Sequence, residues 1–172
     1  MRNNRQHRFQ VPLLQLGAAC ADYQDRAFRD LNCRRLECDE IWQYCYAKEK
    51  NVPIEKRNVF GYGDVWTWIA IDAETKLIPC WMVGTRDAVS ARMFIRDMAS
   101  RLKNRVQLTT GGHKPYLEAV ESAFGDDIDY AMLIKLYAED ALAEKRYSPA
   151  ANTGARKETI TGNPNRKLIS TS

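Results

Sequence analysis

The sequence contains few of the residues from which metal centres and disulfide frameworks are built. It has only two His, and its five Cys are odd in number and include no Cys-x-x-Cys pair. Structural zinc sites draw on closely spaced Cys and His, so we do not expect one here. We expect the Cys to be reduced thiols, as is usual in the cytosol.

Long apolar runs are also missing. No run approaches the ~20 residues of a transmembrane helix, so we expect no membrane partner. The basic N-terminus is not followed by an apolar segment and a small-residue cleavage site, which argues against a secretory signal. What is present is the composition of one soluble domain: 172 residues, of which 45% are hydrophobic and 28% charged. We therefore predict a cytoplasmic protein.

Basic charge gathers at the two ends of the chain. Residues 1–10 carry a net charge of +3, residues 11–143 of −3, and residues 144–172 of +4. Basic ends can bind a polyanion such as DNA, but they are also typical of solvated, mobile termini. Charge alone favours the second interpretation.

Hydrophobic periodicity predicts three helices and five strands. The first helix, 13–31, is indicated by apolar residues at steps of three and four: Leu13, Leu16, Cys20, Tyr23, Ala27 and Leu31. In chain order there follow strands at 34–46, 64–71 and 76–83, a helix at 88–103, a strand at 105–110, a helix after Gly111-Gly112 and a strand at 127–136. Pro79 lacks an N–H, so its strand should lie at a sheet edge.

The order of these elements predicts an α/β fold. Three successive strands indicate an antiparallel meander, and the later alternation of helix and strand indicates right-handed parallel crossovers. We predict a mixed sheet with helices on both faces, in an order that matches the ribonuclease-H-like fold up to its fifth strand. That fold normally ends with one more helix, whereas the polar residues after about 138 indicate irregular structure, so we expect it to be incomplete at its C-terminus. The predicted parts are an N-terminal arm and helix (1–32), a ribonuclease-H-like core (33–137) and an irregular basic tail (138–172).

Asp39 is the unusual residue of its strand, on the opposite pleat from Cys38 and Trp42. A carboxylate in a central strand is costly unless it is paired or binds a metal. Metal-assisted phosphoryl transfer needs such a residue, because carboxylates hold two Mg²⁺ ions about 3.5–4 Å apart. A second carboxylate would then be expected just past Leu108-Thr109-Thr110. One alternative is an edge strand. Another is a buried salt bridge, with Arg34, Arg35 or Arg105 as the partner.

Several blocks of residues, weak one by one, are specific when they occur together in one order. They are Cys38–Trp42, Gly63–Trp68, Gly84–Asp87, Arg105–Thr110, Tyr116–Glu121, Ala123–Gly125, Asp129–Ala131 and Arg146–Pro149. These blocks closely resemble the transposase family of insertion sequence one, over a stretch from about residue 16 to the last residue. The resemblance implies a metal-dependent enzyme that cuts the ends of a mobile element and joins them to target DNA.

The resemblance also implies a catalytic set of Asp, Asp and Glu on a ribonuclease-H-like core, with Mg²⁺ or Mn²⁺ as the cofactor. Asp39 matches the first Asp and is the implied catalytic and metal-binding residue. The implied partners are DNA, at the element ends and the target, and either a second copy of the chain or a full-length transposase. A DNA-bound protein of this kind would be associated with the nucleoid.

Two departures from the family pattern matter most. The family has Thr-Thr-Asp-Gly-His where this chain has Thr109-Thr110-Gly111-Gly112-His113, so Gly111 stands at the position of the second catalytic Asp. The family's Glu lies on a helix that begins shortly after the motif matched by Ile169–Ser172, and the chain ends at Ser172. The family's N-terminal zinc-binding and helix-turn-helix region has no match either. We therefore expect a catalytically defective fragment, or a remnant that binds DNA or a full-length transposase without enzymatic activity.

Four other carboxylates are candidates to replace the lost ones. Glu40 points to the opposite pleat from Asp39, and turns or helix caps explain the other three: Asp64, Asp72 and Asp87. Replacement is not expected, because a catalytic site tolerates errors of ~1 Å poorly. A ribonuclease or another nuclease of the same fold would fit the strand order but not the motif blocks.

Three residues are candidates for contacts with DNA. Arg92 and Arg96 lie one turn apart on their helix and could bind phosphates, although a solvated helix face explains them equally well. His113 could position DNA near the metal site by its place in the motif; on its own it is an exposed helix start. Trp66 and Trp68 could stack on bases, but a buried strand explains them better.

Overall fold

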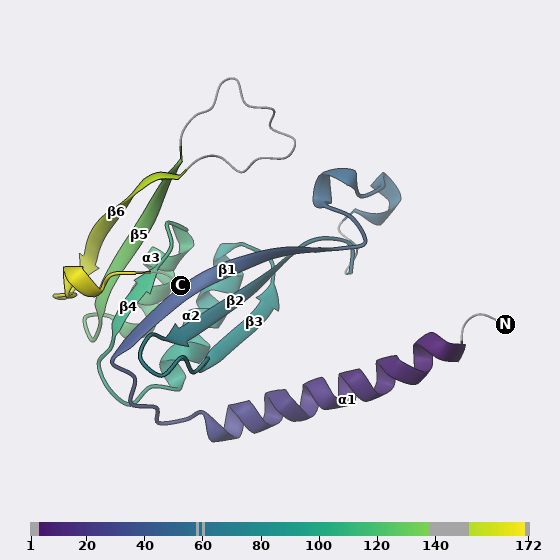
Figure 1. The fold of residues 1–172 in the computed structure, drawn as a ribbon, viewed down its shortest axis with the longest axis horizontal. Coiled ribbons are helices and arrows are strands. Elements are labelled where there is room, and N and C mark those ends of the chain that lie inside the picture. The colour runs from purple at the N-terminus through teal and green to yellow at the C-terminus, as the bar shows by residue number, and fades with distance from the viewer. Residues whose placement is uncertain (1–3, 58, 60, 138–151, 171–172) are drawn as a thin grey trace.

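Within the described residues, a six-stranded mixed sheet forms the body of the protein (Figure 1). The computed structural model describes residues 4–57, 59, 61–137 and 152–170. In chain order the elements are α1 (Asn4–Ala27), β1 (Arg35–Cys45), η1 (Glu49–Asn51), η2 (Ile54–Lys56), β2 (Gly63–Asp72), β3 (Cys80–Gly84), α2 (Ala88–Ser100), β4 (Gln107–Thr110), α3 (Pro115–Phe124), β5 (Asp129–Tyr137), β6 (Asn152–Thr161) and η3 (Arg166–Leu168). The strands lie side by side in the order β3-β2-β1-β4-β5-β6.

The pairing of the strands confirms the predicted α/β, ribonuclease-H-like sheet up to its fifth strand. Strands β1, β2 and β3 form an antiparallel meander, and β4 and β5 run parallel to β1. β1 therefore lies inside the sheet, between β2 and β4. β3 lies at an edge, as Pro79 predicts, although the strand begins only at Cys80 and not at residue 76.

Helices α2 and α3 pack against each other on one side of the sheet, called the packed face below. The prediction of helices on both faces is therefore wrong for the described residues. The crossovers β3-α2-β4 and β4-α3-β5 run in the same direction along the sheet, and right-handed crossovers in one direction fall on one face. The core lies between this face and the two helices, and its largest fully buried side chains are Trp68, Tyr116, Tyr130 and Phe94.

The opposite side of the sheet, called the open face below, is crossed by no α-helix in the part of the chain that the structure describes. Side chains alternate between the two faces along β1, so Asp39 lies on the open face, and Cys38 and Glu40 lie on the packed face. Helix α1 does not cover the open face, because it extends away from the body and meets it only near its C-terminal end (Figure 1). This helix is longer than predicted at its start and ends at Ala27. No described helix is long and apolar enough to span a membrane.

Strand β6 corrects the prediction of irregular structure after about residue 138. Residues 152–161 pair antiparallel with β5 and extend the sheet at its other edge, whereas residues 138–151 lie outside the described part of the chain. Most side chains of β6 are exposed, so the strand needs no alternation of apolar and polar residues. A strand without this alternation is not detected from the sequence. Charged residues such as Arg156 and Glu158 are typical of an edge strand, where they discourage pairing with another sheet.

The five Cys are free thiols that fall into two groups. Cys20 and Cys45 are exposed, whereas Cys33, Cys38 and Cys80 are buried. Burial raises the pKa of the Cys38 and Cys80 thiols, and it raises the pKa of Cys33 to about 11. The buried thiols therefore stay protonated and pack as small apolar side chains, as the sequence predicts for Cys38 and Cys80.

Candidate functional site

Asp39 lies near the middle of β1, on the open face of the sheet. The backbone N–H of Glu40 donates a hydrogen bond to its Oδ1 at 2.9 Å, and no described residue donates to its Oδ2. It forms no ion pair within the described residues; Arg105, one of the predicted partners, pairs with Asp129 at 2.8 Å instead. Neither an edge strand nor a buried salt bridge therefore explains this carboxylate, which is held at one oxygen and open at the other.

Gly111 follows directly on β4 and lies beside Asp39. Because β1 and β4 are parallel, with Cys38 opposite Thr110, the next residue of each strand lies at the same level of the sheet. A Cβ atom built on Gly111 would lie 4.0 Å from Oδ1 of Asp39 and would meet no closer atom outside its chain neighbours. There is room for a side chain at this position. The geometry thus places Gly111 beside Asp39.

A cavity of about 310 Å³ opens beside the Asp39–Gly111 pair. Arg86 and Lys135 also line it, together with Glu40. Arg86 is not free, because it pairs with the carboxylate of Glu40 at 3.1 Å. The charged side chains that line the cavity are thus two acidic and two basic ones, Asp39 and Glu40 against Arg86 and Lys135.

Glu37 is the residue that sequence reasoning missed. It lies two residues before Asp39 and therefore on the same face, and only 5% of it is exposed. Its Oε1 accepts a hydrogen bond from the hydroxyl of Ser170, near the C-terminal end of the described chain. The spacing of two residues already indicates that Glu37 lies on the same face as Asp39. Its hydrogen-bond partner Ser170, however, is far away in the sequence.

The segment after β6 crosses the open face from β5 over β4 to β1. It leaves β6 at Gly162, and the backbone N–H of Asn163 donates to Oδ1 of Asp129 at 2.8 Å. Over β4, the side chain of Gln107 accepts from the N–H of Asn165 at 2.9 Å and donates to its carbonyl oxygen at 3.3 Å. Over β1, Ser170 bonds to Glu37. We call residues 162–170 the C-terminal strap; it leads the chain to the row of acidic residues on β1.

The other carboxylates that could replace a lost ligand are held elsewhere. The side chain of Glu40 lies on the packed face, 4% exposed, in its ion pair with Arg86. The other three bind backbone or hydroxyl groups: Asp64 accepts from Glu49 N, Asp72 accepts from Thr75 Oγ1, and Asp87 caps α2 through Ser90 N. The predicted roles of Asp72 in a turn and of Asp87 as a helix cap are confirmed.

The residues present do not fit a two-metal centre of the Asp-Asp-Glu kind. Such a centre needs a bridging carboxylate and further carboxylates from neighbouring elements. Asp39 is the carboxylate predicted to bridge the two ions, but Gly111 beside it has no side chain to offer. Among the described residues, no group of three His, Cys, Asp or Glu is placed to hold a metal ion.

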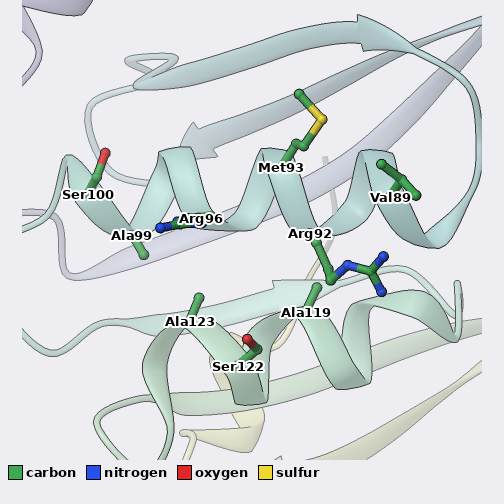
Figure 2. A pocket seen from close by; sticks show the side chains of 9 residues that line it. All are labelled: Val89, Arg92, Met93, Arg96, Ala99, Ser100, Ala119, Ser122 and Ala123. Atoms are coloured by element: carbon green, nitrogen blue, oxygen red, sulfur yellow. The ribbon is translucent and has the colours of Figure 1, made fainter.

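Arg92 and Arg96 lie on α2, far from Asp39 on the other side of the sheet. They line a groove of about 770 Å³ between α2 and α3. Figure 2 shows Arg92 reaching from α2 towards α3, whose Ala119, Ser122 and Ala123 form the opposite wall. Arg92 pairs with Glu118 of α3 at 3.2 Å, whereas Arg96 has no partner among the described residues. The two Arg are thus accessible to a phosphate, but not one that also contacts Asp39.

His113 is not an exposed helix start. Its ring packs against Trp68 and Tyr116, with centroids 5.7 and 5.9 Å away, and its Nε2 is buried without a hydrogen-bond partner in the described chain. Burial, and then the charge of Arg86, lower the pKa of His113, so the imidazole is neutral at neutral pH. A neutral ring turned into the core does not favour the predicted contact with DNA. Trp68 itself is fully buried, as predicted.

Comparison with known proteins gives a family match over the core. Residues 59–140 match a family model described as a DDE domain, of insertion-sequence transposases. The matched stretch includes Gly111 and begins after Asp39. The chain therefore resembles a DDE-type insertion-sequence transposase, as its motif blocks predict. No curated protein matches it.

Among solved structures, part of this chain is similar to a piggyBac transposase in a synaptic complex with hairpin DNA. The two chains are 12% identical, with a TM-score of 0.40. The similar region covers 69% of this chain and 27% of that transposase, so the chain spans about a quarter of the length of that protein.

Proposed function

We propose that this chain is the core of a DDE-type DNA transposase whose strand-transfer chemistry is disabled at Gly111. The observation that carries the proposal is the pairing of β1 with β4, which sets position 111 beside Asp39. The match of residues 59–140 to a DDE domain supports the family, and the missing side chain at 111 supports the defect. Mg²⁺ or Mn²⁺ would be the ion of the intact family.

The physical reason for the defect is the number of ligands. Two divalent cations about 3.5–4 Å apart need several carboxylate oxygens from different elements. Asp39 alone offers two oxygens, one of which already accepts the N–H of Glu40. Water can fill an empty coordination position, but it does not fix the second ion. We therefore expect neither productive metal binding nor cleavage of DNA.

A protein of this kind without catalysis can still bind its partners. Its predicted partners are DNA of the element ends or the target, and a second copy or a full-length transposase. The basic residues on α2 support a contact with phosphates, because Arg96 has no partner among the described residues. A DNA-bound protein without catalysis would lie in the cytoplasm on the nucleoid, where it would compete with an active transposase for its sites.

The first test is a cleavage and strand-transfer assay on duplex DNA from the ends of its own element. We expect no product above background with Mg²⁺ or with Mn²⁺, and no change on Asp39→Ala. Robust cleavage that disappears in Asp39→Ala would contradict the proposal, because Asp39 would then work with ligands other than residue 111.

The second test is titration with Mn²⁺, which reports on the site without activity. Gly111→Asp should tighten Mn²⁺ binding about tenfold, or about 1.4 kcal/mol, because a carboxylate there joins Asp39 on one cation. The matched control is Gly111→Asn, which adds a side chain of equal size without the charge. In the double variant Gly111→Asp with Asp39→Ala, the affinity for Mn²⁺ should fall below that of Gly111→Asp alone. Equal Mn²⁺ affinity in Gly111→Asp and Gly111→Asn would mean that position 111 does not share a cation with Asp39.

A further inference from the structure

Helix α1 presents most of its side chains to solvent. Among the described residues, its side-chain bonds to the body of the protein come from its last turn. Gln24 donates to the carbonyl oxygen of Ile78 at 3.0 Å, and Asp25 pairs with Arg101 at 3.1 Å. Outside α1 itself, no described residue forms a side-chain hydrogen bond or an ion pair with residues 12–23. Figure 1 shows this part of the helix extending away from the sheet. Nothing in the described fold explains why it carries large apolar residues.

Five exposed residues of α1 form one continuous stripe. Leu13, Leu16, Cys20, Tyr23 and Ala27 follow each other at steps of three, four, three and four residues. That average of 3.5 residues is the repeat of a coiled-coil seam, in which two helices pack side by side. Leu13 is 66%, Leu16 61% and Tyr23 66% exposed, so the described part of the chain does not cover these large side chains of the stripe. A stripe with this repeat fits another helix that has the same repeat.

The charges of α1 permit that other helix to be an identical one. Of the positions beside the seam, Pro12, Gly17, Ala19 and Gln24 are uncharged and Arg26 is charged. Arg26 is neutralised by Asp22 of the same helix, and Asp25 pairs with Arg29 just past its end. Two copies of the helix would therefore meet without repulsion between like charges along the seam.

We propose that α1 pairs with α1 of a second copy of this chain, through the stripe from Leu13 to Ala27. Each copy supplies the same surface, as in the isologous interface of a two-fold dimer. The stripe holds only two heptads, fewer than the three or four of an independent coiled coil, so the dimer is weak and depends on concentration. The inference does not rest on the proposed function, because no residue of the candidate site takes part.

The test compares two Leu that lie on the same helix. Leu16 belongs to the stripe, whereas Leu14 is even more exposed, at 74%, and points away from it. The mass of the full chain should rise with concentration in sedimentation equilibrium. Leu16→Lys should raise the dissociation constant at least about tenfold, whereas Leu14→Lys should leave it nearly unchanged. The two variants lose the same apolar side chain from the same helix, so a general effect on the fold would change both equally.

A crosslinking experiment locates the contact. Cys20 is the middle residue of the stripe, so in a pair centred on it Cys20 faces its own counterpart, whether the helices run parallel or antiparallel. In a Cys45→Ser background, which removes the other exposed thiol, a short bismaleimide should give a covalent dimer. Cys20→Ser should abolish that dimer, because the remaining three thiols are buried.

The outcomes that would overturn the proposal are distinct. One is a chain that stays monomeric at every concentration tested. Another is a dimer that weakens equally in Leu16→Lys and Leu14→Lys. A third is crosslinking that persists in the Cys20→Ser variant, which would place the contact elsewhere. Circular dichroism of each variant should show the same helix content as the parent chain.

Discussion

The packed face and the open face of the sheet use their residues in different ways. On the packed face, Trp68, Phe94 and Tyr116 are fully buried, with the ring centroids of the two neighbours 5.8 and 5.5 Å from that of Trp68. On the open face, Asp39 is partly exposed, and a Cβ atom built on Gly111 would meet no atom closer than 4.0 Å outside its chain neighbours. The comparison shows that position 111 lies where the fold leaves room for a side chain. A substitution there should therefore cost less stability than one on the packed face.

The largest expected effect compares two Trp on the two faces. Trp68→Ala should lower the free energy of unfolding by about 3–5 kcal/mol, because it empties the centre of the aromatic cluster. Trp81→Ala, at the open face of β3, should cost at most about half as much, because Trp81 is 45% exposed. Urea unfolding of the two variants measures both values. Equal losses would mean that the open face contributes as much to stability as the packed face.

A smaller effect concerns the helix cap on the packed face. Asp87→Ala should lower the free energy of unfolding by about 1 kcal/mol at pH 7, because the N–H of Ser90 loses its acceptor. The hydrogen bonds from Ser90 and Thr85 lower the pKa of Asp87 in the folded state. Its contribution is therefore complete above the unfolded pKa of about 4, and it is lost as the pH falls through the lower folded-state pKa.

Unfolding of the parent chain and of Asp87→Ala at a series of pH values checks this prediction. The difference between the two should shrink as the solution becomes acidic. Glu74→Ala is the matched control, since Glu74 is an exposed acid whose side chain makes no bond with the described residues. A difference that stays constant down to strongly acidic pH would show that the Asp87 carboxylate does not act as an ionised cap.

The smallest effect concerns the strap on the open face. Gln107→Ala removes both side-chain bonds to Asn165, and it should speed amide hydrogen exchange in the strap. Global stability should change by less than about 1 kcal/mol, because the bonds are exposed to water. Gln43→Ala, on the same face of β1, is the control. Unchanged exchange in Gln107→Ala would mean that the strap is held by Ile169, which is buried, and not by hydrogen bonds.

Most of the sheet could be predicted from the sequence, because its strands carry a clear hydrophobic pattern. The edge position of β3 followed from Pro79, whereas the position of β1 inside the sheet had an edge strand as its alternative. Strand β6 was missed, since a polar edge strand that is exposed has no alternation to detect. The two helices were placed on both faces because the pattern of a helix shows which side is apolar, but not which face of the sheet it covers.

The candidate site was predictable only in part. Asp39 was singled out because a carboxylate in the middle of a strand is unusual. Gly111 was singled out because the family motif has an Asp at its position. Glu37 was missed because its partner, Ser170, is 133 residues away. His113 was expected at the surface, and the structure turns it inwards against Trp68. Such contacts depend on tertiary packing, which residue types and spacing do not reveal.

The C-terminal strap has a consequence for the order in which the protein folds. The meander β1-β2-β3 pairs residues that are close in sequence, so it can form early, even while the chain is still being synthesised. Asp39 acquires its neighbour only when β4 has docked in parallel beside β1. The bond between Ser170 and Glu37 closes the longest loop of all, so it should form last. Glu37 and Asp39 thus lie on the strand that forms first, and the C-terminal strap reaches this strand last.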